Sequence, residues 1–106
     1  MIDFIKTLFS AQEETDLTEI IKKKPFLVDV RTPLEFNQNH IKGSINIPLN
    51  TLSSNLGKFK GKKDIVVFCR SGNRSSQALS ILQSNGISGV VNGGSLQNVD
   101  KYMNTN

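Results

Sequence analysis

The only cysteine of the chain, Cys69, stands at the end of an apolar run and at the start of a turn. Residues 65–68 are Ile-Val-Val-Phe, and two of the three arginines of the chain, Arg70 and Arg74, follow within five residues. A helix N-terminus or a nearby arginine can lower the pKa of a cysteine from about 8.5 to roughly 3.5–7.5. We therefore interpret Cys69 as a nucleophile that is ionised at neutral pH, against the alternative of an inert core residue.

The turn after Cys69 has the composition of an anion-binding loop. Gly72 and Asn73 tolerate positive φ, which lets successive backbone N–H groups point into one concavity. The arginines can bind an oxyanion such as a thiosulfonate, sulfite or phosphate, or they can make surface ion pairs only. The candidate substrate-binding residues are Arg70, Ser71, Gly72, Asn73, Arg74 and Ser75.

Strands and helices alternate along the predicted secondary structure. Thr32, Pro33 and Glu35 form a local helix-start signal with a capping box. Gly93 and Gly94 indicate a turn. We expect a first helix over residues 16–24, with Asp16 as its N-cap and Glu19 reaching back to that cap. The other expected helices are a short one from Pro33 and those over residues 49–59, 74–85 and 96–103. The expected strands cover residues 26–30, part of 40–48, 64–69 and 87–91.

This alternation predicts a three-layer α/β domain with a mainly parallel central sheet and helices on both faces. Ligands bind such sheets at the carboxyl ends of the strands. Asp29 and Arg31 end one predicted strand and Cys69 ends another, so we expect them at one rim. We interpret Asp29 and Arg31 as a structural pair that supports the site.

Composition limits the remaining classes of function. The chain has 106 residues, which is one domain, and we divide it into an N-terminal extension (residues 1–15) and a folded domain (residues 16–106). No signal peptide or membrane span is evident, and a lone cysteine forms no internal disulfide, so we expect a cytoplasmic protein without a membrane partner. The net charge of +4 comes from lysine clusters that we interpret as solvated surface, not a nucleic-acid site. With a single histidine, His40, and no nucleotide fingerprint, we expect no metal and no cofactor.

Several segments together resemble the single-domain rhodanese-like sulfurtransferases over about residues 16–100. They are Leu27-Val28-Asp29-Val30-Arg31, Glu35-Phe36, residues 40–48 (His-Ile-Lys-Gly-Ser-Ile-Asn-Ile-Pro), residues 66–75 around Cys69, and Gly93-Gly94. The chain departs from the family at Asn98, where a tryptophan is common, and at Asn39, where a glycine often precedes the histidine.

The resemblance implies that Cys69 takes a sulfane sulfur from a small anionic donor such as thiosulfate. It would hold that sulfur as a persulfide and pass it to a thiol, to cyanide or to a protein acceptor. Four residues separate Cys69 from Arg74, whereas phosphatases and arsenate reductases of similar architecture resemble a pattern with five. The shorter loop favours sulfur transfer over phosphatase or arsenate-reductase chemistry. A non-enzymatic sulfur-carrier or protein-docking module is the other alternative.

Overall fold

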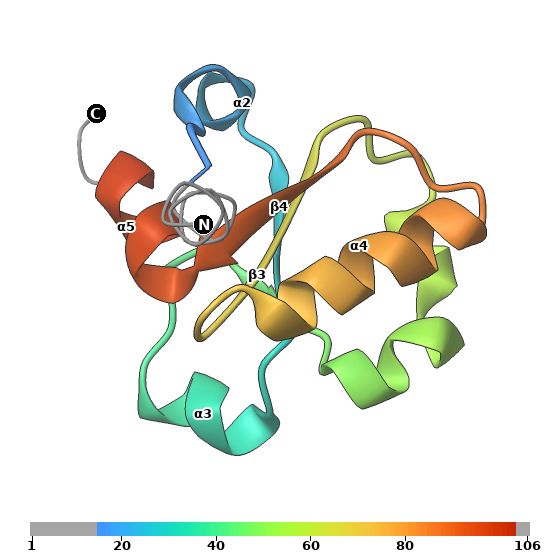
Figure 1. Cartoon of the computed structure of the whole chain (residues 1–106), viewed down its shortest axis with the longest axis horizontal. Coiled ribbons are helices and arrows are strands. Elements are labelled where there is room, and N and C mark those ends of the chain that lie inside the picture. The colour runs from blue at the N-terminus through green and yellow to red at the C-terminus, as the bar shows by residue number, and fades with distance from the viewer. Residues whose placement is uncertain (1–14, 104–106) are drawn as a thin grey trace, which may run out of the picture.

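A four-stranded parallel sheet in the order β2-β1-β3-β4 forms the centre of the protein (Figure 1). The computed structural model describes residues 15–103. Every neighbouring pair of strands is parallel, which confirms the predicted type of sheet. The strands are β1 (Phe26–Asp29), β2 (Ile45–Asn46), β3 (Ile65–Cys69) and β4 (Val90–Ser95).

The central strand β3 is buried on both of its faces. Because side chains alternate along a strand, Ile65, Val67 and Cys69 lie in one hydrophobic cluster, while Val66 and Phe68 lie in a second. The sheet is therefore covered on both sides, and the nucleophile candidate belongs to the first of these cores.

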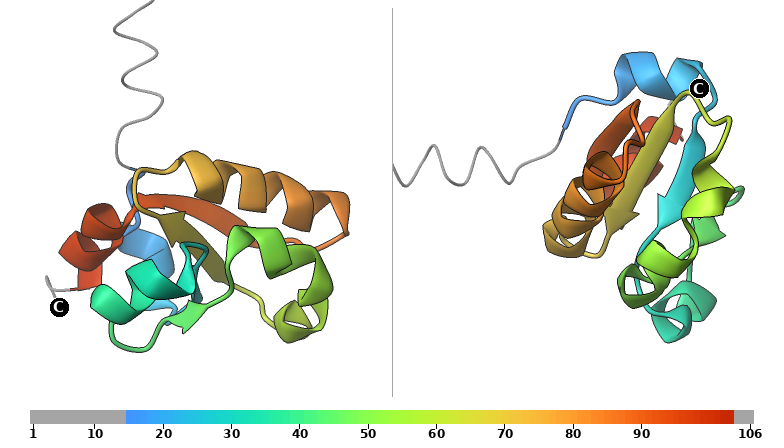
Figure 2. Two further views of the ribbon diagram at one scale, coloured as in Figure 1. Left: turned by 90° about the horizontal axis from the view of Figure 1, so that it is seen from below. Right: turned by 90° about the vertical axis from the view of Figure 1, so that its right-hand side faces the viewer.

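Helices cover both faces of the sheet, as predicted. The helix α4 (Asn73–Ser84) packs on β3 and β4 and against the 3₁₀ helix η1 (Leu49–Ser54) on the first face (Figure 2). The helix α5 (Leu96–Met103) packs on β4 and β3 and touches α2 (Thr18–Lys22) on the second. The segment 49–59, which we expected as one weak helix, forms η1 and a second 3₁₀ helix, η2 (Leu56–Phe59).

The short helix α3 (Pro33–Gln38) begins as the sequence predicted. The Oγ1 of Thr32 accepts a hydrogen bond from the Glu35 backbone at 3.2 Å, and Glu35 Oε1 accepts one from the Thr32 backbone at 3.0 Å. This capping box is complete. In Figure 1, α3 lies close to the turn that joins β3 to α4.

The first helix starts later than its pattern indicated. α2 begins at Thr18, and Asp16 Oδ1 accepts from both the backbone and the hydroxyl of that residue, at 2.9 and 2.6 Å. Glu19 contacts Lys22 at 3.5 Å and does not reach back. The prediction of a capping box at Asp16 and Glu19 is wrong, because the aspartate caps an amide only two residues ahead.

The predicted turn at Gly93 and Gly94 is also wrong, since β4 continues through both residues. Val67 pairs with Asn92 and Phe68 pairs with Gly94, so Gly93 is the extra residue of a β-bulge. A Cβ atom at Gly93 would lie 2.7 Å from a methyl of Val66 and 2.9 Å from a methyl of Val99. The glycine is therefore required by close packing in the middle of a strand.

The predicted N-terminal extension lies outside the described residues except for Thr15, and its boundary stays a prediction. Within residues 15–103, no helix is both long enough and apolar enough to cross a membrane.

Candidate active site

Cys69 is the last residue of β3 and is fully buried. Its Sγ atom accepts hydrogen bonds from the backbone N–H of Gly72 at 3.0 Å and of Ser75 at 3.4 Å. The Ser75 hydroxyl oxygen lies 3.5 Å from the same sulfur. Amides of the turn thus point at the sulfur, which is the geometry expected of a curled anion-binding loop.

These contacts lower the pKa of the Cys69 thiol. Burial acts to raise the pKa of Cys69, but the hydrogen bonds from the Ser75 side chain and from the backbones of Ser75, Ser71 and Gly72 outweigh burial. The pKa therefore lies below its ordinary value. Hydrogen bonds to the charged form are a sufficient cause of such a shift, and the thiolate is the nucleophilic form.

The tight curl of the turn depends on Gly72, which has a φ of +100°. A side chain is disfavoured at this angle, so glycine is required here. Asn73, which we expected to share this conformation, is instead the first residue of α4 and does not have a positive φ. The side chains of Ser71 and Asn73 are exposed at the surface of the turn.

The buried Ser75 hydroxyl connects the turn to β4. Its Oγ donates to Asn92 Oδ1 at 2.7 Å, and it also lies 3.0 Å from the Gly72 carbonyl oxygen. The backbone N–H of Gly94 donates to the same Asn92 oxygen at 2.9 Å. Asn92 is thus part of the site, although the sequence analysis did not identify it.

The guanidinium of Arg74 forms a two-pronged ion pair with Glu35. Nη1 lies 2.7 Å from Oε1 and Nη2 lies 3.0 Å from Oε2. The hydrogen bond from Arg74 and then that from the Thr32 backbone lower the pKa of Glu35 from 4.5 to about 2. Arg74 therefore lies near Cys69 as a cation that is already paired with Glu35. Its direct contact with a bound anion stays a prediction. Glu35 was recognised in the sequence only as a helix cap, because its partner lies 39 residues away.

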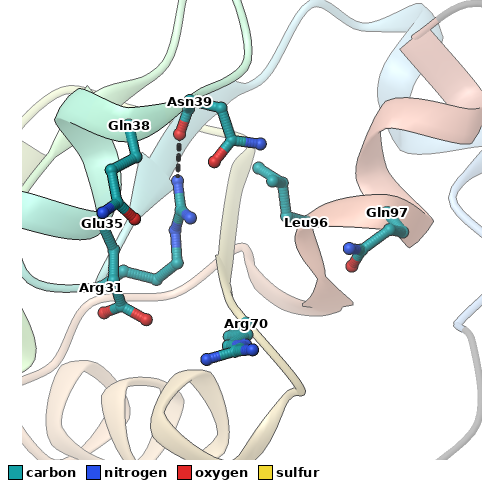
Figure 3. A pocket seen from close by; sticks show the side chains of 7 residues that line it. All are labelled: Arg31, Glu35, Gln38, Asn39, Arg70, Leu96 and Gln97. Atoms are coloured by element: carbon teal, nitrogen blue, oxygen red, sulfur yellow. Dashed lines mark hydrogen bonds between the residues drawn. The ribbon is translucent and has the colours of Figure 1, made fainter.

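A polar pocket of about 230 Å³ opens beside the turn (Figure 3). Arg70 reaches it with an exposed guanidinium that has no ion pair within the described part of the chain. Figure 3 shows side chains from α3 and α5 on the opposite walls. The lining residues are Arg31, Glu35, Gln38, Asn39, Arg70, Leu96 and Gln97.

Asp29 and Arg31 form the expected pair, with Arg31 Nη2 2.8 Å from Asp29 Oδ2. Both residues are buried, and Arg31 Nη2 also donates to the Asn39 carbonyl oxygen at 2.7 Å. Two further hydrogen bonds link the Arg31 Nε to the carboxylate oxygens. The pair therefore fixes the end of β1 to the segment after α3.

The fold and the site together are a parallel α/β sheet with a cysteine at the carboxyl end of strand β3 and an amide-lined turn around its sulfur. The rhodanese-like domain family model matches residues 13–98, so the chain belongs to this family.

Named relatives agree with this assignment. The chain is 30% identical over 92 residues to a sulfurtransferase of Allochromatium vinosum, covering 87% of this chain and 81% of that protein. It is 38% identical over 74 residues to the thiosulfate sulfurtransferase PspE of Escherichia coli, covering 68% and 71%. A solved E. coli rhodanese with anions matches with a TM-score of 0.63 and 35% identity, covering 69% of this chain and 88% of that one. The family and these relatives support a sulfurtransferase activity.

Proposed function

We propose that this protein is a thiosulfate-type sulfurtransferase that carries sulfur as a persulfide on Cys69. The observation that carries the proposal is the sulfur itself, which accepts amide hydrogen bonds from Gly72 and Ser75 at 3.0 and 3.4 Å. An ionised sulfur in this position has the nucleophilic form that the reaction requires.

The reaction has two displacement steps. In the first, the Cys69 thiolate attacks the outer sulfur of thiosulfate, the donor S–S bond breaks, and sulfite leaves with the bonding electron pair. In the second, a thiolate or cyanide attacks the outer sulfur of the Cys69 persulfide. The S–S bond on the enzyme breaks, the Cys69 thiolate returns, and a persulfide or thiocyanate is released. No external oxidant or reductant is needed.

The chain's own residues bind and orient the reactants. The turn amides stabilise negative charge on the cysteine sulfur and then on the persulfide. The exposed Arg70, which makes no ion pair with residues 15–103, supplies a cation at the pocket, where it attracts the anionic donor and holds the departing sulfite. The exposed side chains of Ser71 and Asn73 complete the proposed anion contacts.

The short turn supports sulfur transfer over phosphatase chemistry. The Gly72 amide contacts Sγ directly at 3.0 Å, so the turn closes tightly around the sulfur itself. We also propose a cytoplasmic location, since a lone nucleophilic thiol has to remain reduced.

The test is the intact mass of the protein after incubation with thiosulfate, with sulfite measured in the same sample. We expect a gain of one sulfur atom on Cys69 with one sulfite released, and cyanide should then remove this sulfur as thiocyanate. Cys69→Ser should show neither event, while Ser80→Ala, an exposed serine on α4, should behave as the wild type.

Two results would overturn the proposal. Wild-type protein that gains no mass while releasing no sulfite would favour a docking module. Hydrolysis of an aryl phosphate that depends on Cys69, without sulfur loading, would favour the phosphatase alternative.

A further inference from the structure

The Ser75 hydroxyl is a single hydrogen-bond donor among several acceptors. It is fully buried, and its oxygen lies 2.7 Å from Asn92 Oδ1, 3.0 Å from the Gly72 carbonyl oxygen, and 3.5 Å from both Cys69 Sγ and the Gly94 carbonyl oxygen. A hydroxyl group has only one hydrogen to donate. The acceptors therefore compete, and the shortest contact is with Asn92.

The orientation of the Asn92 amide is fixed by its second neighbour. The Gly94 backbone N–H lies 2.9 Å from Oδ1, and a backbone N–H can only donate. The atom that faces Ser75 is therefore an oxygen, and the Ser75 hydroxyl has to be the donor in their contact. Asn92 pairs with Val67 in the sheet, so its side chain lies on the α4 side, as that of Cys69 does.

The competition depends on the state of the sulfur. When Cys69 is a neutral thiol, its S–H can donate to Ser75 Oγ while the Ser75 hydroxyl donates to Asn92, and every group is satisfied. When the thiol loses its proton to solvent, the Cys69 sulfur becomes a hydrogen-bond acceptor. The Ser75 hydroxyl can then donate to the sulfur only by giving up its hydrogen bond to Asn92. A stronger hydrogen bond from the Ser75 hydroxyl to the side chain at position 92 thus favours the neutral thiol of Cys69.

We propose that Asn92 is a positioning residue that competes with the Cys69 sulfur for the Ser75 hydrogen and thereby sets how readily this sulfur ionises. The inference rests on Cys69 being the nucleophile of the proposed function. It goes beyond that function by assigning control of the nucleophile to a side chain of β4, outside the turn that holds Cys69.

Charged groups near the sulfur come from other elements and stay constant when residue 92 is changed. They are Arg70 directly after Cys69 in the turn, Arg74 on α4 with its partner Glu35 on α3, and the Asp29–Arg31 pair at the end of β1. The strand β4 itself has no charged residue between Val90 and Ser95. Changes at position 92 therefore isolate the competition for the hydrogen.

The test is the ultraviolet absorbance of the thiolate as a function of pH, read as the difference between each protein and its Cys69→Ser counterpart. Asn92→Ala should lower the pKa of Cys69 by about half a unit to one unit, which is the effect of one neutral hydrogen bond. Asn92→Asp keeps the acceptor and adds a negative charge, so it should raise the pKa by about one unit or more.

A double-mutant cycle separates this competition from a structural effect on the bulge. In a Ser75→Ala background there is no hydroxyl hydrogen to share, so Asn92→Ala should no longer move the pKa. A shift of equal size in that background would overturn the proposal, as would a fall in pKa on Asn92→Asp. Because the readout is ionisation and not turnover, these outcomes are independent of whether sulfur loading occurs.

Discussion

The carboxylate of Glu35 joins the start of α3 to the start of α4, and the Glu35→Gln variant tests how much this junction stabilises the fold. In the native protein Oε1 accepts from the Thr32 backbone at 3.0 Å and from Arg74 at 2.7 Å. Glutamine retains one oxygen for Thr32 but removes the charge that faces the Arg74 guanidinium.

The magnitude follows from the pKa of Glu35, which the hydrogen bond from Arg74 and then that from Thr32 lower from 4.5 to about 2. At about 1.36 kcal/mol per unit, this difference corresponds to roughly 3 kcal/mol before screening. The side chains of Arg74 and Glu35 are 32% and 23% exposed. Because solvent screens such a pair, we expect a loss of about 1–2 kcal/mol in the free energy of unfolding.

The sign of the pH dependence is fixed by the lowered pKa. A carboxylate whose pKa is depressed in the folded state stabilises the protein above its unfolded pKa of 4.5, and this contribution is lost as the pH falls towards about 2. Urea unfolding followed by far-ultraviolet circular dichroism should therefore show the full difference between wild type and Glu35→Gln near neutral pH. The difference should narrow steadily below about pH 5.

Glu19→Gln is the matched control. Glu19 contacts Lys22 at 3.5 Å, but its side chain is 84% exposed, so removal of its charge should change stability by only a few tenths of a kcal/mol. A Glu35→Gln difference that does not vary with pH, or one no larger than that of Glu19→Gln, would refute the reasoning.

Two further substitutions probe strands β1 and β4, which lie on either side of β3. Gly93→Ala places a Cβ 2.7 Å from Val66 and 2.9 Å from Val99, and should lower the free energy of unfolding by about 1–3 kcal/mol in a thermal melt. Asp29→Asn leaves the buried Arg31 without its countercharge, and should cost about 3–5 kcal/mol in urea unfolding. A melting temperature unchanged by Gly93→Ala, or a cost below about 1 kcal/mol for Asp29→Asn, would contradict these expectations.

Features fixed by neighbouring residues were predictable from the sequence. The capping box of Thr32 and Glu35 involves residues three apart, and it forms as predicted. The strand that ends at Cys69 and the helix that follows it were also predicted to within one residue at each end. In these segments local propensity, hydrophobic pattern and tertiary packing favour the same structure.

Features fixed by distant residues were not predictable. Two consecutive glycines usually indicate a turn, but Gly93 is needed because Val66 and Val99 leave no room for a side chain. Nothing local indicated that Glu35 would pair with Arg74, or that Asn92 would lie against the Ser75 hydroxyl. The sequence thus indicated the candidate nucleophile and its turn, while the residues that contact them became evident only in three dimensions.

The side chain of Cys69 is 0% exposed, although it ends the strand at the rim of the sheet. A dissolved electrophile can reach such an atom only after some of the residues packed around it move aside. Peroxide and alkylating agents meet the same barrier, so the resting thiol is protected from adventitious damage. At high reagent concentration, the rate of reaction at Cys69 Sγ then reaches a plateau that is set by the rate at which the surrounding residues open.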